Sequence, residues 1–193
     1  QLLPVITDIF NCCIENGIVP RDWKYAILTV LFKKGDPLDM NNYRGISVLP
    51  VLAKLFEKLL AEQITNYFIV NNLFYSGQHG FRKGHSCETA LHELLSELNV
   101  ARDVKKIVLL LFIDFRKAFD TVDADLLIVK LLNYGFDDPA IKLIKSYFEE
   151  RQQVINHVDK STPHPCNPQP VTLGVPQGSC LGPLFLLTII TIN

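Results

Sequence analysis

The chain has 193 residues, of which 48% are hydrophobic and 20% are charged. This composition is typical of a globular protein with one sizeable core and excludes an intrinsically disordered chain. The formal net charge of −1 excludes a globally basic surface, so any nucleic-acid contact would depend on local clusters of basic residues. Such clusters stand at Lys33-Lys34, at Arg82-Lys83 with His85, and at Lys105-Lys106.

The cysteines, the lack of a long apolar run and the chain ends bear on the class of protein and its cellular environment. Five cysteines form no CxxC pair and five histidines show no metal-ligand spacing, so we expect reduced thiols, an intracellular protein and no zinc site. No apolar run approaches the roughly 20 residues of a membrane span, and no signal peptide opens the chain, so we expect no membrane partner. Because the sequence begins at Gln1 and ends on LFLLTIITIN, we expect a piece of a longer protein.

The first half of the chain predicts three helices and a strand. Apolar spacing indicates a helix from Leu2 to Cys13, β-branched and aromatic residues indicate a strand from Tyr25 to Phe32, and Ser86 is placed to cap a later helix. For the helix predicted over residues 49–68, the expected buried face holds Leu49, Leu52, Phe56, Leu59 or Leu60 and Ile64, with Lys54, Glu57, Lys58 and Glu62 in solvent. The helix after Ser86 is expected to bury Leu91, Leu94, Leu95 and Leu98.

The second half opens on an unbroken apolar run. A buried strand is predicted over Ile107 to Phe112, because the seven apolar residues in a row from Ile107 to Ile113 suit a strand covered on both faces. Helices are predicted over residues 124–135 and 137–151, the second with Asp138 as N-cap and Pro139 at its first position. A strand over residues 152–158, a proline-rich loop over 161–170 and a strand leading into a glycine-rich turn over 171–183 complete an α+β chain.

Asp114 stands where the predicted buried strand ends. A carboxylate at a strand end suits Mg²⁺, which prefers oxygen ligands and is bound through one or two protein carboxylates. A turn-former or a helix cap is an equally supported interpretation of this residue. For Asp120 and Asp123, the spacing favours caps of the helix that follows.

Two glycine-bracketed segments are further candidate sites. Arg82 and Lys83 lie in the loop QHGFRKGHS, where charge and exposed N–H groups suit a phosphate, although solvated surface is the commoner role of such a cluster. In GVPQGS, from Gly174 to Ser179, the backbone can approach a ligand closely and the Gln177 amide offers a donor and an acceptor. Taken alone, this segment is more simply a turn that joins a strand to a helix.

Four stretches in a fixed order carry more information than any one of them. They are NNYRGISVLPVLAKLFEKLL, QHGFRKGHSCETAL, LLLFIDFRKAFDTVDADLLIVKLL and GVPQGSCLGPLFLL. Together they resemble the reverse transcriptase domain of non-LTR (LINE-like, jockey-type) retrotransposons over about Trp23 to Leu187. The resemblance implies a right-hand polymerase fold, with fingers over residues 1–106 and a partial palm over residues 107–193.

The resemblance also implies roles for the matching residues. Asp114 matches the first metal-binding aspartate of the palm, which holds Mg²⁺, and the backbone of Phe115 lies at the nucleotide. Phe119 matches an aromatic residue that excludes a 2′-hydroxyl and so favours deoxynucleotides. The other implied contacts are Arg44 with Lys33 or Lys34 for the triphosphate, Gly174, Gln177 and Gly178 for the nucleotide pocket, and Arg82 with Lys83 for template or primer. The implied reaction adds dNTPs to a DNA primer 3′-hydroxyl on an RNA template.

The chain departs from the family pattern at two positions and at its end. Gly45 stands where proline is usual, and Ala124 where histidine is common. The Asp-Asp hairpin that completes a two-ion Mg²⁺ site would lie beyond Asn193, so we expect no catalysis by this chain alone. The alternative is a non-catalytic retroelement remnant that binds nucleic acid or protein. The family implies the cytoplasm and nucleus, and a partner in the C-terminal part of the same polyprotein.

Overall fold

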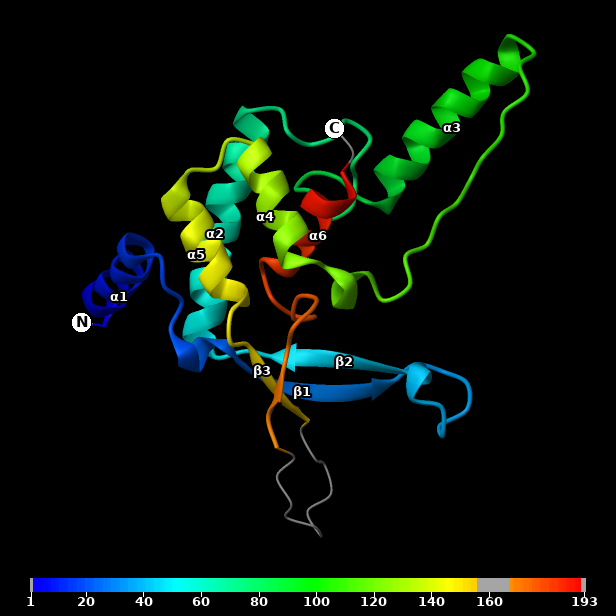
Figure 1. The fold of residues 1–193 in the computed structure, drawn as a ribbon. Helices are drawn as coiled ribbons and strands as arrows, with labels where there is room; N and C mark the ends of the chain where they lie inside the picture. The colour runs from blue at the N-terminus through cyan, green and yellow to red at the C-terminus, as the bar shows by residue number, and fades with distance from the viewer. Residues whose placement is uncertain (1, 156–166, 192–193) are drawn as a thin grey trace. The chain divides into compact units, whose positions relative to one another are not determined.

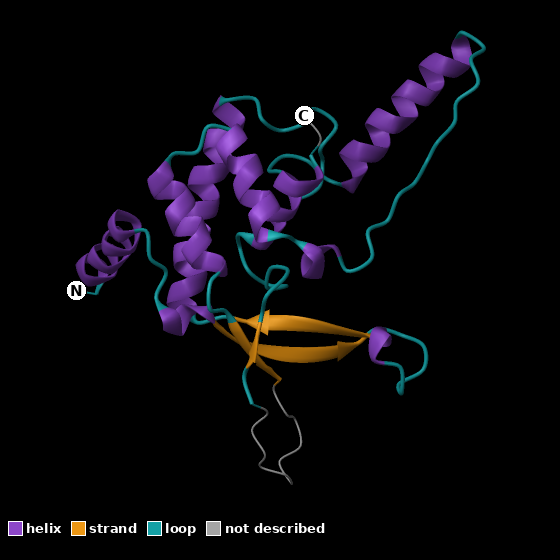
Figure 2. Ribbon diagram, in the orientation of Figure 1, coloured by secondary structure: helices purple, strands orange, loops and turns teal. Residues whose placement is uncertain are grey.

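The computed structural model describes residues 2–155 and 167–191. The chain divides into two compact units, the first formed by Gln1–Thr65 with Lys117–Asn193 and the second by Asn66–Arg116. Among the described residues, α-helices accompany one small mixed sheet, which confirms the predicted mixture of helix and strand (Figure 2). The assignment of fingers and palm stays a prediction, because compactness alone does not identify them.

The sheet belongs to the first unit and has the strand order β2-β1-β3-β4 (Figure 1). Its members are β1 (Tyr25–Phe32), β2 (Tyr43–Val48), β3 (Gln152–Ile155) and β4 (Gln169–Pro170). Strand β1 runs antiparallel to β2 and parallel to β3, and β4 runs antiparallel to β3. The sheet therefore brings segments from both ends of the sequence together.

The strands agree with the sequence predictions only in part. Strand β1 is confirmed with its predicted bounds, and β3 confirms the described part of the strand predicted over residues 152–158. Residues 156–158, and residues 161–166 of the predicted proline-rich loop, lie outside the described residues. The strand predicted to begin at Val171 is wrong, because the extended pairing stops at Pro170. Strand β2 went unpredicted, since its mixed polar sequence becomes a strand through pairing with β1.

Helices of the first unit pack against one another beside the sheet. They are α1 (Leu3–Asn16), α2 (Val51–Val70, whose last residues belong to the second unit), α4 (Ala124–Asn133), α5 (Asp138–Phe148) and α6 (Gly182–Ile190). Helix α5 contacts α1 and α4, and α4 contacts α6. In Figure 1, α2, α4, α5 and α6 all lie to one side of the strands. Across the described part of the chain, no helix combines the length and apolar composition needed to span a bilayer.

Two aromatic groups mark the core of the first unit. The rings of Phe10, Trp23 and Phe56 meet with centroid distances of 5.1 to 5.8 Å. Phe185, which is fully buried, contacts Tyr147 with a ring-centroid distance of 5.6 Å. These contacts join α1, α2, α5 and α6 and fix the frame on which the loops of this unit are held.

The starts of α4 and α5 test the predicted caps. Asp123 confirms its role as an N-cap, because its carboxylate accepts a hydrogen bond from the N–H of Leu126 at 2.9 Å. Asp137, not Asp138, is the N-cap of α5, with its carboxylate accepting from Ala140 N at 3.1 Å. The prediction was wrong by one residue, since proline is tolerated anywhere in the first turn and does not distinguish two adjacent aspartates.

The second unit contains the helix α3 (Cys87–Asp103). Ser86 is its N-cap as predicted: its hydroxyl accepts from Thr89 N, and the Thr89 hydroxyl accepts from Ser86 N. The predicted buried stripe of Leu91, Leu94, Leu95 and Leu98 is wrong, because no residue of α3 is buried. Amphipathic spacing identifies an apolar face but cannot show that another element covers it.

The strand predicted over Ile107–Phe112 is also wrong. This segment has no regular secondary structure and joins no sheet among the described residues, and Ile107 and Leu109 are 99% and 93% exposed. A strand needs a neighbour to pair its backbone N–H and C=O groups, and apolar composition does not specify one. The Asp114 carboxylate that follows is therefore not held at the mouth of a buried strand.

Candidate functional site

The glycine-rich turn Gly174–Ser179 is docked through backbone hydrogen bonds on two separate elements. Its Gln177 carbonyl accepts from Ser47 N on β2 at 2.7 Å. Its Gly174 N–H donates to Val122 O, and its Val175 N–H to Phe119 O at the short helix η3 (Ala118–Thr121), both at 2.8 Å. Because main-chain groups make these contacts, the path of the turn is fixed whatever its side chains do.

Glycine is required at two positions of this turn. Gly174 has φ of +86°, and a Cβ there would lie 2.7 Å from Asp120 Cα. Gly178 has φ of +117°, and a Cβ there would lie 2.8 Å from Ser47 O. Any side chain would therefore meet backbone in a conformation that L residues rarely adopt. The two glycines allow the turn to approach both η3 and β2.

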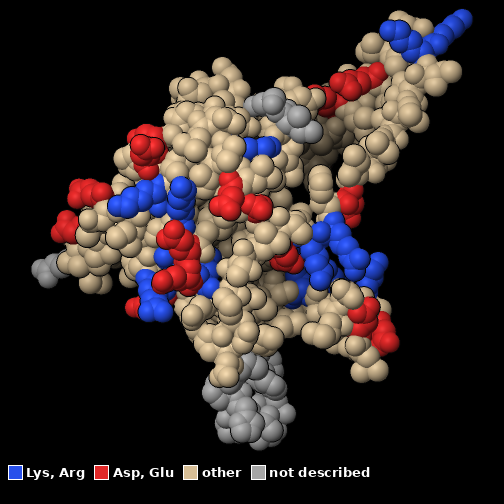
Figure 3. Space-filling model, in the orientation of Figure 1, with Lys and Arg blue, Asp and Glu red and all other residues tan. Residues whose placement is uncertain are grey.

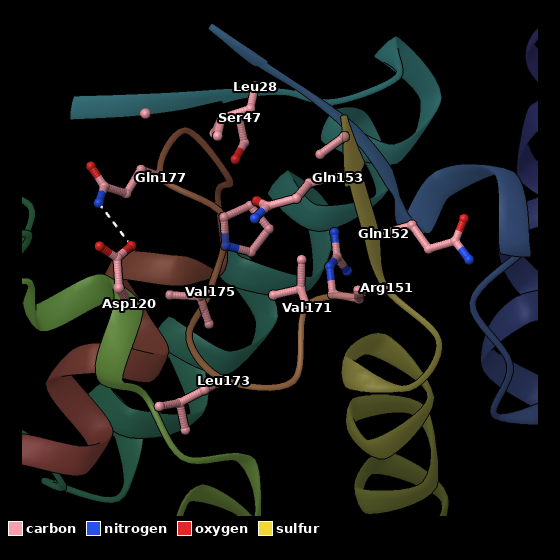
Figure 4. Close-up of a pocket in the computed structure, with 13 residues that line it drawn as sticks. Leu28, Ser47, Asp120, Arg151, Gln152, Gln153, Val171, Leu173, Val175 and Gln177 are labelled. Carbon is pink, nitrogen blue, oxygen red and sulfur yellow. Dashed lines mark hydrogen bonds between the residues drawn. The ribbon is translucent and has the colours of Figure 1, made fainter. Parts of the chain in front are cut away.

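A pocket of about 260 Å³ lies between this turn and the sheet (Figure 4). The Gln177 side chain reaches its edge, where Nε2 donates to Asp120 Oδ1 at 3.0 Å. Ser47, Gln152 and Gln153 contribute further polar groups to the lining. The arrangement offers amide, hydroxyl and carboxylate groups around a space that could hold one ring-sized part of a ligand.

Other predicted residues of the first unit lie around this turn or at the end of β1. Arg44 is exposed on β2 next to the pocket-lining Gly45. Lys33 and Lys34 follow β1 with exposed side chains, and Lys33 N donates to Asn42 O at 2.8 Å. Phe119 is half-buried in η3 and does not line the pocket, although its carbonyl holds the turn.

The remaining predicted residues belong to the second unit. Asp114 and Phe115 are exposed in the extended segment after α3. Arg82 stacks on Phe74, with 5.3 Å from its guanidinium carbon to the ring centroid, and Lys83 beside it is exposed. The Arg82 contact gives this arginine a local structural role in the loop.

The segments that form this turn and pocket occur together in one known family. Residues 32–192 match the family described as reverse transcriptase (RNA-dependent DNA polymerase). The chain belongs to this family. The match covers both the docked turn and β2, so the geometry described above is that of a reverse transcriptase segment.

Three similar proteins come from mobile elements of Drosophila melanogaster. The probable RNA-directed DNA polymerase from transposon X-element is 36% identical over 96% of the chain, and the one from transposon BS is 34% identical over 96%. The RNA-directed DNA polymerase from mobile element jockey is 32% identical over 95% of the chain. The chain spans about a fifth of each of these relatives, 20% in every case.

The described part of this reverse transcriptase segment does not fit a complete two-ion metal site. Within it, no three His, Cys, Asp or Glu side chains gather in a group that could hold a metal ion. The Asp114 carboxylate is exposed, and the Asp120 carboxylate is bound by Gln177. Two Mg²⁺ ions need several oxygen ligands, which is more than the single carboxylate of Asp114 offers.

A buried charged group behind the turn was missed by the sequence analysis. Glu57 on α2 was predicted to face solvent, but it is only 3% exposed. Its Oε2 accepts from Cys180 N at 2.7 Å and from Leu181 N at 3.5 Å, just before α6. A signal was present, because Glu57 shares a helical face with Ala53, Phe56 and Leu60, which all lie in or near the core.

Two neighbours complete this buried group. Arg151, also 3% exposed, donates from Nη1 to Tyr147 O at 2.8 Å, and its guanidinium carbon lies 4.3 Å from the Tyr147 ring centroid. Burial raises the pKa of Glu57, while hydrogen bonds from the two N–H groups and the charge of Arg151 oppose that rise. Burial, then the charge of Glu57, raises the pKa of Tyr147, so its hydroxyl stays protonated.

Proposed function

We propose that this chain is the nucleotide-binding part of an RNA-directed DNA polymerase of right-hand fold, acting within a longer polyprotein. The observation that carries the proposal is the Gly174–Ser179 turn, fixed by backbone bonds to β2 and η3 with Gln177 at a pocket edge. Membership of the reverse transcriptase family supports the same function. The reaction would be template-directed addition of a dNTP to a primer 3′-hydroxyl on RNA.

Each predicted residue has a proposed role in that reaction. Gln177 and Gly178 shape the pocket for the base or sugar, since about 260 Å³ is too small to enclose a whole nucleoside triphosphate. Phe119 sets the preference for deoxyribose, and Phe115 lies at the nucleotide. Arg44 with Lys34 contacts the triphosphate, Arg82 with Lys83 contacts template or primer, and Asp114 is one Mg²⁺ ligand among several.

Primer extension on an RNA template with Mg²⁺ and dNTPs tests the proposal in the full-length protein that carries this chain. Asp114→Asn should reduce extension to background, because removing a metal-binding carboxylate removes charge compensation from the reaction. Asp125→Asn, an exposed aspartate in the first turn of α4, is the matched control and should extend normally. Equal extension by the Asp114 variant and the control would reject the role of Asp114.

The proposed nucleotide contacts of Phe119 and Gln177 are tested separately. Phe119→Ala should raise the rate at which the full-length enzyme incorporates ribonucleotides by about 10-fold or more over the parent. The reason is that a smaller side chain no longer excludes the 2′-hydroxyl. Gln177→Ala should raise the KM for dNTP while leaving primer affinity unchanged. Unaltered ribonucleotide incorporation by Phe119→Ala, together with an unaltered KM for dNTP in Gln177→Ala, would place the nucleotide elsewhere.

A further inference from the structure

The start of α6 is capped by a side chain from another helix. Leu181 occupies the N-cap position of α6 without a side-chain cap of its own. The Glu57 carboxylate of α2 supplies the missing acceptor for Cys180 N at 2.7 Å and Leu181 N at 3.5 Å. A carboxylate at a helix N-terminus is stabilised by free N–H groups and by the helix dipole, so this contact ties α6 to α2.

The contact also fixes the turn, because the turn and the helix start are continuous. Ser179 N donates to Pro176 O at 3.0 Å, and the Ser179 hydroxyl accepts from Gly182 N at 2.9 Å. Only Gly178 and Ser179 separate Gln177 from the capped Cys180 N–H. A displacement of the Cys180 backbone would therefore also move Gln177 and its side-chain amide.

The charge of Arg151 favours the ionised form of the Glu57 carboxylate and opposes the burial that raises its pKa. The two charges attract each other inside the core, and the Arg151 guanidinium is held against the Tyr147 ring. Arg151 Nη2 is buried without a hydrogen bond to any described residue. A buried guanidinium with an unused donor depends on a nearby counter-charge, and Glu57 is that counter-charge.

We propose that Glu57 and Arg151 are positioning residues for Gln177. The Glu57 carboxylate accepts from the Cys180 and Leu181 N–H groups, and Arg151 lines the same small cavity as Glu57 and Leu181. The turn just before Cys180 presents the Gln177 amide to Asp120 at the pocket edge. Glu57 does not line the pocket, whereas Arg151 is part of its lining (Figure 4). The proposal rests on the proposed function only in treating the pocket as the nucleotide site.

Amide hydrogen exchange on the chain of 193 residues tests the positioning directly. Glu57→Ala should accelerate exchange of the Cys180 and Leu181 N–H groups about 10-fold or more, with amides of α5 unchanged. The side-chain amide resonance of Gln177 should shift in the same sample. Glu57→Gln, which keeps the size and one acceptor but loses the charge, should show a smaller change in the same direction.

The control is Glu62→Gln, an exposed glutamate on the same helix, which should alter neither signal. Arg151→Gln should reproduce the Gln177 shift although it touches neither Cys180 nor Leu181. If the Glu57 and Arg151 variants leave the Gln177 resonance and the two exchange rates at parent values, the positioning proposal is wrong. Faster exchange at every amide would indicate general destabilisation and would likewise overturn it.

A second measurement separates this proposal from the proposed function. In the full-length protein, Glu57→Gln should raise the KM for dNTP about 10-fold with a smaller change in kcat, since a misplaced amide weakens nucleotide binding. An active parent with an unchanged KM in this variant overturns the positioning while the polymerase function stands. An inactive parent overturns the polymerase function, and the exchange rates still decide the positioning.

Discussion

Gly174 is constrained by both its backbone conformation and its surroundings. A Cβ at this position would lie within 2.8 Å of three Asp120 backbone atoms, which cannot rotate away as a side chain can. Gly17, at the end of α1, shares a positive φ of +64°, but the atoms that a Cβ would meet there belong to the flexible Lys142 side chain. Substitutions at the two glycines therefore distinguish the cost of a strained backbone conformation from the added cost of a clash with backbone atoms.

Gly174→Ala should destabilise the protein by about 3 kcal/mol or more, because strain and overpacking add at this site. Gly17→Ala should cost only about 1 kcal/mol, the contribution of strain alone. Denaturant unfolding monitored by Trp23 fluorescence measures both variants against the parent. Equal losses in the two variants would show that η3 can move away from the turn.

The pH dependence of unfolding tests the environment of Glu57. Burial raises its folded-state pKa above the ordinary value of 4.5, so the folded protein binds this proton more tightly than the unfolded chain. Its contribution to stability is then fully present below about pH 4.5 and is lost as the pH rises through the folded-state pKa. Glu57→Gln cannot titrate and removes this dependence.

Parallel urea titrations from pH 4 upward give the measurement. The unfolding free energy of the parent minus that of Glu57→Gln should fall as the pH rises, starting near the ordinary value of 4.5. A difference that rises with pH would mean that Arg151 and the two N–H donors outweigh burial and lower the pKa instead.

Among the helices and strands, local sequence patterns predicted where helices form but not which segments pair in the sheet. Capping residues and apolar spacing predicted α4, because the information for a helix lies within a few neighbouring residues. Strand β2 and the unpaired Ile107–Phe112 segment were misjudged for one reason: a strand is defined by a distant neighbour. The same limit explains Glu57, whose partners at Cys180 and Leu181 stand more than 120 positions away.

The start of α5 gives a test at this scale. Asp137→Ala should destabilise the protein by about 1 kcal/mol, because the Ala140 N–H loses its acceptor. Asp138→Ala should cost about 0.5 kcal/mol or less, since Asp138 contributes only a charge near the helix N-terminus. Thermal unfolding of the two variants side by side distinguishes them. A larger loss for Asp138→Ala would restore the cap predicted from the sequence.

For the whole molecule, the net charge offers little long-range electrostatic attraction to a nucleic acid. The net charge is −1, and acidic and basic side chains are interspersed on the face shown in Figure 3. Any binding of RNA would therefore depend on local contacts, for which Arg44, Arg82 and Lys83 are the candidates. The docked turn could be predicted from GVPQGS and the family pattern, whereas its attachment to η3 and β2 could not, because backbone contacts leave no mark in the sequence.

Salt dependence of RNA binding tests those local contacts. Replacing Arg44, Arg82 and Lys83 with Gln should weaken binding of single-stranded RNA and reduce the slope of log K against log salt by about 2, near 0.7 for each lost phosphate contact. A control that replaces the exposed Lys58, Lys142 and Lys145 removes the same charge and should keep the parent slope. Equal slopes in the two variants would show that net charge alone governs binding.

The same titration, read beside primer extension, decides between the two functions. Salt-dependent binding together with extension by the full-length protein supports the polymerase. Salt-dependent binding without extension by that protein supports the non-catalytic alternative, because phosphate contacts need no metal site whereas nucleotide transfer does. The triple variant also loses the stacking of Arg82 on Phe74. Arg82→Lys separates the two effects, because lysine keeps the positive charge but not the planar stacking group. This single variant should loosen the loop while preserving most of the slope.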